Sequence, residues 1–170
     1  MTLKTILVPY DGSEQADDLL RLACAEVGGE GRVVALYVTR VPPSLPLDGL
    51  PVRVDAAGND ALDHAEDVTR RYDGVLETRL VRARRGVDAV VGEAREIGAD
   101  AIFLPLASGG VWRRWGHARA AWKIVRRAPC RVLLCYTPAL GDLYSASDAP
   151  SAATGQGYDY EDDSLARRRA

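Results

Sequence analysis

The chain has 170 residues, of which 47% are hydrophobic and 27% are charged, and its formal net charge at pH 7 is −2. This length and apolar content suit one globular domain with one core, and the near-neutral charge argues against the broad basic footprint of a nucleic-acid-binding domain. No apolar run approaches the ~18 residues that cross a bilayer and no signal-like segment opens the chain, so we expect a soluble protein of the cytoplasm.

The first half of the chain alternates between strand and helix patterns. Residues 3–9 are dense in Ile, Leu and Val, which is typical of a parallel strand buried on both faces. Ser13 is placed to cap a helix that keeps apolar residues at helical spacing as far as Val27. After a second strand over 33–38, the segment 39–58 has four prolines and no clear period, so we expect a long connection over the top of the sheet.

The second half supplies the remaining helices and strands. They are a helix capped by Asn59 and ending near Tyr72, a half-exposed edge strand over 77–83, a helix opened by Gly86 and closed by Gly98, and two apolar strands over 101–106 and 132–135. Strands that alternate with helices imply a parallel α/β sheet with right-handed crossovers.

The C-terminal part of the chain differs in composition from the rest. From Gly141 onward it is rich in Ser, Ala, Gly and Asp without an apolar period. Residues 138–170 carry six acidic side chains against three arginines, which leaves the rest of the chain close to neutral. We expect a domain over residues 1–137 and a disordered tail over 138–170.

Three short motifs punctuate this pattern. Tyr10-Asp11-Gly12-Ser13 follows the first strand, Asp100 opens the fourth, and Ala128-Pro129-Cys130 precedes the fifth. With these motifs, residues 3–136 resemble the universal stress protein family in its single-domain form. The resemblance implies a Rossmann-like, doubly wound parallel sheet of five strands in the order 3-2-1-4-5 with helices on both faces. It also implies a homodimer whose last strands pair across the axis, through Arg131, Val132, Leu133 and Leu134.

In that family, a G-x2-G-x9-G-[ST] loop between the fourth strand and the next helix holds nucleotide phosphates. Alignment without gaps gives Pro105, Ser108 and Ala118 at the three glycine positions and Arg119 at the hydroxyl position. Proline has no N–H to donate, and a Cβ obstructs a close approach to phosphate. No other register restores the motif, because Gly109, Gly110 and Gly116 include no pair three residues apart. We therefore expect a degenerate site, no ATP binding of the family's kind and no cofactor.

The front half of the family's nucleotide site is better preserved. By resemblance, Pro9 and Asp11 after the first strand and Val38 and Val41 near the end of the second would flank an adenine base. The Asp-Gly-Ser sequence equally serves as a strand-to-helix turn with a cap. The alternative function is thus a nucleotide-binding switch of the ATP or AMP type, in which arginine side chains replace the glycine loop. Its candidate residues are Pro9, Asp11, Val38, Val41, Ser108 and Arg119.

The segment between Asp100 and Asp142 contains no acidic residue, seven lysines and arginines, and all three tryptophans. A helical projection places Ala118, Ala121, Val125 and Ala128 on its inner face. It can be a core helix with a solvated basic face, an interface for an acidic protein partner, or a contact for nucleic acid or membrane. The candidate interaction residues are Trp112, Arg113, Arg114, Trp115, Trp122 and Arg126.

The chain shows no catalytic constellation. His64 falls outside the inward face of its helix, and His117 has no carboxylate nearby in sequence to orient it as a base. Glu93 and Glu96 are interpreted as surface charges, and the three cysteines, in apolar patterns without metal-ligand spacing, as reduced buried thiols. Walker, nucleophile-elbow and metal motifs are absent. The prediction is a non-enzymatic regulatory or interaction protein of the stress response.

Overall fold

The computed structural model describes residues 3–27, 31–47, 52–72, 75–105 and 118–135. The contacts divide the chain into two units, Met1–Ala139 and Leu140–Ala170, and all described residues belong to the first. The expected tail over 138–170 lies outside the described residues, so its disorder stays a prediction.

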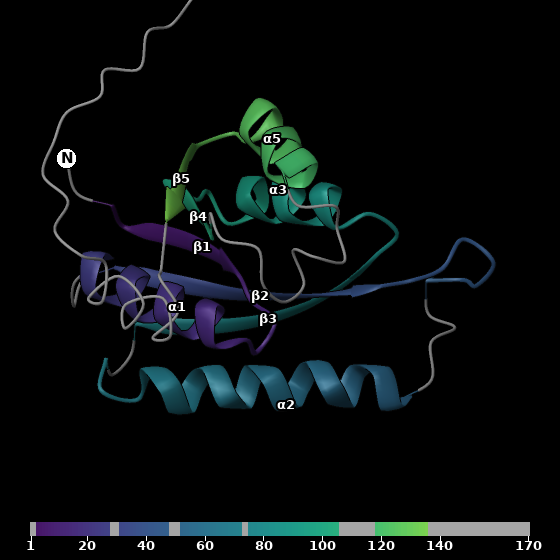
Figure 1. Cartoon of the computed structure of the whole chain (residues 1–170), viewed down its shortest axis with the longest axis horizontal. Helices are drawn as coiled ribbons and strands as arrows, with labels where there is room; N and C mark the ends of the chain where they lie inside the picture. The colour runs from purple at the N-terminus through teal and green to yellow at the C-terminus, as the bar shows by residue number, and fades with distance from the viewer. Residues whose placement is uncertain (1–2, 28–30, 48–51, 73–74, 106–117, 136–170) are drawn as a thin grey trace, which may run out of the picture. The chain divides into compact units, whose positions relative to one another are not determined.

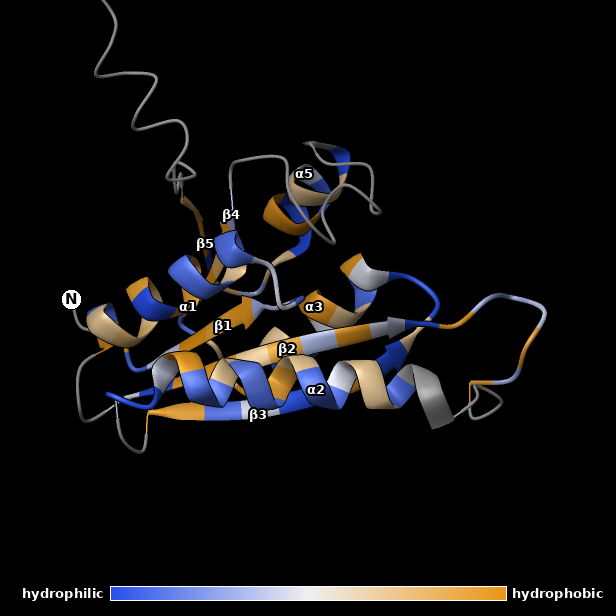
Figure 2. Ribbon diagram, turned by 60° about the horizontal axis from the view of Figure 1, so that its bottom comes forward, coloured by the Kyte–Doolittle hydropathy of each residue, from blue (hydrophilic) through white to orange (hydrophobic). Residues whose placement is uncertain are grey.

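The described strands form one parallel sheet (Figure 1). They are β1 (Thr5–Pro9), β2 (Arg32–Arg40), β3 (Leu76–Ala83), β4 (Ala101–Pro105) and β5 (Arg131–Cys135). Their spatial order is β3-β2-β1-β4-β5, which confirms the predicted order. At the centre, Ile6 of β1 pairs with Val33 of β2 on one side and with Ala101 of β4 on the other. Figure 2 shows most of β1 as hydrophobic, as expected for a strand covered on both faces.

Four described helices cover the two faces of the sheet. They are α1 (Glu14–Val27), α2 (Val52–Thr69), α3 (Gly86–Glu96) and α5 (Ala118–Arg127). Because side chains of a strand alternate, Ile6 and Val8 pack in a core cluster with residues of α1 and α2, while Leu7 packs in a second cluster with residues of α3 and α5. The predicted helices on both faces are therefore confirmed.

Helix α2 begins at Val52, seven residues before the Asn59 cap expected from the sequence. Gly58, read as part of the connection, lies inside the helix. A Cβ at Gly58 would lie 2.6 Å from Leu80 Cδ1 and 3.0 Å from Tyr37 Cδ1. The glycine therefore allows α2 to lie close against β2 and β3, and it does not end the helix. Asp55 in the first turn forms an ion pair with Arg82 of β3, which fixes the start of the helix on the same sheet edge.

The inner face of α5 also differs from the prediction. The buried side chains are Ala120 and Ile124, whereas Val125, expected to face inward, is 39% exposed. The helix is thus turned by about one residue from the expected orientation. This rotation buries Ile124 in the cluster that contains Leu104 of β4, and the smaller Val125 is left at the surface.

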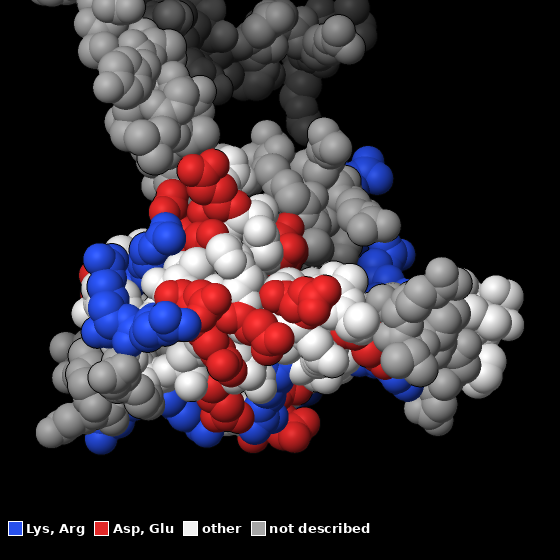
Figure 3. Space-filling view, turned by 90° about the horizontal axis from the view of Figure 1, so that it is seen from below, with Lys and Arg blue, Asp and Glu red and all other residues white. Residues whose placement is uncertain are grey.

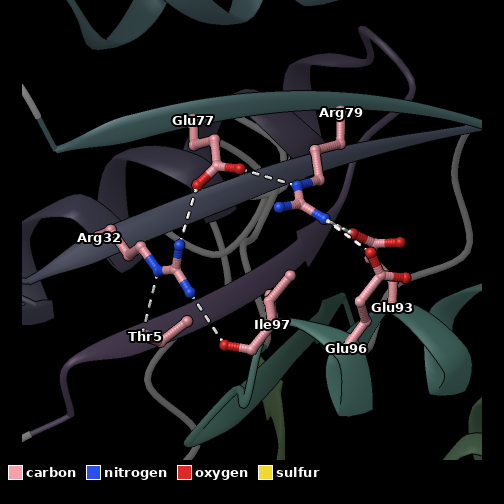
Figure 4. Close-up of polar contacts among 7 residues, drawn as sticks. All are labelled: Thr5, Arg32, Glu77, Arg79, Glu93, Glu96 and Ile97. Atoms are coloured by element: carbon pink, nitrogen blue, oxygen red, sulfur yellow. Dashed lines mark hydrogen bonds and ion pairs between the residues drawn. The ribbon is translucent and has the colours of Figure 1, made fainter.

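A network of charged side chains joins the edge strand β3 to its neighbours (Figure 4). Glu77 accepts from Arg32 of β2 at 3.2 Å and from Arg79 at 2.8 Å. Arg79 also pairs with Glu93 of α3, and Glu96 lies 3.7 Å from the same guanidinium. The prediction for Glu93 was wrong, because only 7% of its side chain is exposed. Its partner comes from a strand that the helix pattern alone does not reveal.

Candidate functional site

The turn between β1 and α1 is built by three successive side chains. Asp11 Oδ1 accepts from the Ser13 N–H at 3.1 Å and from Ser13 Oγ at 2.6 Å. Ser13 Oγ accepts in turn from the Ala16 N–H at 3.3 Å, as an N-cap residue does. Gly12 has φ 76°, a conformation that favours glycine. The structural role foreseen for Asp-Gly-Ser is therefore confirmed, and Asp11 is engaged in the turn.

The four front-half candidates lie at the carboxyl ends of adjacent parallel strands. Pro9 ends β1 and pairs with Leu36, two residues before Val38 on β2. Val41 follows β2, donates its N–H to Ala83 O at 3.0 Å and is 2% exposed. In open α/β sheets, ligands bind outside the carboxyl ends of the strands. The fold thus collects Pro9, Asp11, Val38 and Val41 at this end of the sheet, although Val41 offers little free side-chain surface.

The back half of the candidate site is only partly described. Pro105, at the first glycine position, ends β4 and pairs with Cys135 of β5. Ala118 begins α5, and Arg119 in its first turn is exposed. Ser108 lies outside the described residues, as do the interaction candidates Trp112, Arg113, Arg114 and Trp115.

Helix α5 exposes both cations and apolar side chains. Arg127 lies 2.5 Å from Asp88, so its flank faces α3. Val125, on the other flank by helical projection, is 39% exposed, and Trp122, on the outward face beside Arg126, is 61% exposed. Leu134 of β5 is 47% exposed, and it shares the α5 side of the sheet because its register partner is Leu104. Val125 and Leu134 therefore lie toward the β5 edge. Among the other β5 candidates, Arg131 is exposed, and Val132 and Leu133 are half-buried.

A model of the universal stress protein family matches residues 2–135. The chain belongs to this family. No curated protein matches the chain. A solved universal stress protein in complex with cAMP has 19% identity and a TM-score of 0.62, with 81% of this chain and 100% of that chain covered. The protein from Archaeoglobus fulgidus in complex with dAMP gives 17% and 0.60 over 78% and 96%. A family member from Burkholderia pseudomallei gives 28% and 0.57 over 81% and 97%.

This universal stress protein holds a polar cluster that the sequence analysis missed. Tyr10 OH donates to Asp17 Oδ1 at 2.5 Å, and His64 Nε2 lies 3.0 Å from Asp17 Oδ2. Tyr10 and Asp17 are buried, whereas half of the His64 side chain is exposed. Burial and the hydrogen bond to Asp17 raise the pKa of Tyr10 far above its usual value. The one available signal was that Asp17 stands three residues before Leu20, on the inward stripe of α1.

The outer face of α1 and α2 in this universal stress protein is acidic. Figure 3 shows Asp and Glu side chains gathered across it, with a basic group at one end. Near that end, a shallow hollow of about 450 Å³ is lined by Arg21, Asp67, Val68, Arg70 and Arg71. Two of these guanidinium groups already have carboxylate partners, since Arg21 pairs with Asp18 and Arg70 with Asp67. The hollow therefore holds little unpaired positive charge for an anion.

In the described part of this universal stress protein, none of the groups of His, Cys, Asp and Glu is arranged to hold a metal ion. None of the described helices is both long and apolar enough to cross a membrane.

Cys24 is buried, as predicted, but Cys130 and Cys135 are half-buried. Burial raises the pKa of Cys24 to about 11, which keeps this thiol protonated and unreactive at neutral pH.

Proposed function

We propose that this universal stress protein is a non-enzymatic regulatory protein of the stress response that does not bind ATP through a glycine loop. The observation that carries the proposal is Pro105. It ends β4 at the first glycine position of the family motif, and a proline has no N–H with which to cradle a phosphate. The free thiols of the three cysteines support a reducing compartment, the cytoplasm, as its location.

The protein acts as a homodimer that pairs through Arg131, Val132, Leu133 and Leu134. Support comes from the position of β5 at the edge of the sheet and from exposed apolar side chains beside it. Val125 and Leu134, two of the large apolar side chains that are exposed in the described residues, lie toward that edge, and Trp122 is exposed on the outward face of α5. Burial of such side chains is the main driving force of association.

The partner that the dimer regulates is an acidic protein. Arg119, Lys123 and Arg126 of α5 are exposed, and within the described residues no carboxylate pairs with them. Trp122 stands beside Arg119 and Arg126 at helical spacing. Tryptophan and arginine are the residues that most often anchor protein interfaces.

A second candidate function is a nucleotide-binding switch. The observation that favours it is the collection of Pro9, Asp11, Val38 and Val41 at one end of the sheet, together with the relatives solved with cAMP and dAMP. In this function, Arg119 replaces backbone donors with a side-chain cation. Such a site is costlier to order than a preformed loop, so we expect weaker binding.

Calorimetric titration with ATP, ADP and cAMP separates the two functions. We expect no saturable heat in the micromolar range. Micromolar binding that is lost in Arg119→Ala and kept in Arg126→Ala would overturn the first proposal and establish the switch. The two variants remove the same charge from the same helix, seven residues apart, so a general electrostatic effect would appear in both.

A further inference from the structure

The connection after β2 carries an apolar tip that the proposed function does not use. All residues from Pro42 to Leu47 are exposed. Leu45 is 37% exposed and Leu47 is 44% exposed, and these two large apolar side chains are only two residues apart. Figures 1 and 2 both show this segment extending beyond the carboxyl ends of β2 and β3, away from the body of the sheet. It does not fold over the sheet as the sequence led us to expect.

The tip is a preformed turn rather than a loose loop. The Leu45 N–H donates to Pro42 O at 3.1 Å, which closes a β-turn with Pro43 at its second position. Arg84 stabilises the turn by donating two hydrogen bonds to its backbone. Its Nη1 donates to Pro42 O at 2.9 Å and its Nη2 donates to Leu45 O at 3.1 Å. A contact through this turn therefore costs little conformational entropy.

Removing the backbone of the tip from water also costs little free energy. Three of its six residues, Pro42, Pro43 and Pro46, have no N–H, and the N–H of Leu45 is already bonded. The carbonyls of Pro42 and Leu45 accept from Arg84. An apolar medium penalises every unpaired backbone group. This turn enters such a medium with most of its donors absent or satisfied.

The charged side chains near the tip indicate which kind of apolar medium it would contact. Arg84 is bonded to two neutral carbonyls, and within the described residues no carboxylate offsets its charge. Arg85 follows it and is exposed. An exposed apolar tip bonded to Arg84, a cation without a carboxylate partner among the described residues, matches the boundary of an anionic bilayer, where leucines lie among the acyl chains and arginines among the headgroups.

We propose that residues 42–47 form a membrane-contact loop, in which Leu45 and Leu47 enter the interfacial region of an anionic lipid bilayer. The contact is peripheral and reversible, because two leucines bury far less apolar area than a spanning helix. It gives the protein a further surface, separate from β5 and from the cations of α5.

Cosedimentation of the full chain with lipid vesicles tests the loop. One set of vesicles is pure phosphatidylcholine, and the other contains equal parts of phosphatidylcholine and phosphatidylglycerol. We expect binding to the anionic vesicles, and a partition coefficient lowered ~10-fold or more in Leu45→Ser/Leu47→Ser, since each leucine contributes buried apolar area. Leu22→Ser is the matched control: Leu22 is 38% exposed on α1, and its loss should leave binding unchanged. Arg85→Gln should weaken binding and reduce its dependence on salt.

Three results would overturn the proposal. The first is no binding to anionic vesicles by the parent chain. The second is binding that survives in the double leucine variant and disappears in Trp122→Ser, which would assign the membrane contact to α5. The third is a change of oligomeric state in the leucine variant without any vesicle binding, which would make the tip a protein contact. Circular dichroism of each variant checks that the fold is kept.

Discussion

At the scale of single residues, the Asp17 carboxylate connects three elements of the fold. It stands on α1, accepts from Tyr10 at the end of β1 and contacts His64 of α2. Asp17, a residue that is 8% exposed, is tolerated in the interior because both of its carboxylate oxygens have partners. The cluster thus fixes α2 against the turn that carries Asp11.

Tyr10→Phe tests this connection. The variant leaves Asp17 Oδ1 without its donor, and we expect a loss of about 1–2 kcal/mol of unfolding free energy at neutral pH. Tyr72→Phe is the control, because the Tyr72 hydroxyl has no hydrogen bond among the described residues. Urea denaturation of both variants and of the parent gives the comparison. An equal effect of the two variants would contradict the role of the cluster.

The same variant predicts a pH dependence with a definite sign. Folding raises the pKa of Tyr10, through burial and the Asp17 hydrogen bond, above the ~10 of a free phenol. The stability carried by the protonated phenol is therefore complete below about pH 10 and declines above it, because the unfolded chain then loses the proton first. Tyr10→Phe removes this decline, so the stability difference between parent and variant should narrow in alkaline urea titrations.

Residue roles were predictable from the sequence where their partners are local. The Asp11–Ser13 turn was foreseen, because its donors and acceptors lie within three residues of each other. Asp17 and Glu93 were not, because their partners lie outside their own helices: Tyr10 precedes α1 by a turn, and His64 and Arg79 lie far away in the chain, on α2 and β3. The position of a carboxylate on an inward stripe signals burial, but it does not name the partner.

At the scale of the elements, Gly58 shows that tertiary packing can place inside a helix a glycine that usually indicates a connection or a helix end. The sequence placed a helix start after it, and the structure places it inside α2 where the helix meets Tyr37 and Leu80. Periodicity located the other elements to within a few residues, because their apolar stripes are regular. The face of α5 was misjudged because alanines give the projection little weight, and Ile124 alone decides which side is buried.

Gly58→Ala and Gly92→Ala form a matched pair. Alanine favours a helix over glycine by about 0.5–1 kcal/mol. At Gly92 of α3 nothing lies within 4 Å of an added Cβ, so we expect that gain in full. At Gly58 the Cβ meets the Tyr37 ring, so we expect a net loss of about 1–2 kcal/mol. Thermal unfolding of both variants gives the signs, and a stabilising Gly58→Ala would contradict the close approach of α2.

At the scale of the whole described domain, the strand order follows from the motifs at its ends, and it was predicted correctly through the family resemblance. The surfaces were not predictable to the same degree. The acidic side chains across α1 and α2 (Figure 3) are scattered in sequence, and they gather only when the two helices lie side by side. The apolar tip at residues 42–47 was read as a covering loop, because prolines mark a connection without giving its direction.

The proposed dimer gives a prediction at this scale. In Leu134→Glu, like charges would face each other across the axis of paired β5 strands, and we expect the molar mass in sedimentation to fall from that of two copies to that of one. Leu22→Glu adds the same charge at a similarly exposed position of α1 and should leave the mass unchanged. A parent chain that sediments as a single copy at high concentration would contradict the dimer.

The charged network on β3 bears on how far such an assembly can grow. A parallel sheet has two edges, and an uncovered edge invites other chains to add strands. On β3, Glu77 and Arg79 place charge on the edge strand, and their ion-pair partners Arg32 and Glu93 hold them from β2 and α3 (Figure 4). Charged side chains on an edge strand disfavour the addition of another strand. In the proposed dimer, two copies pair through the same β5 edge, and such a closed contact ends at two copies instead of continuing into a fibre.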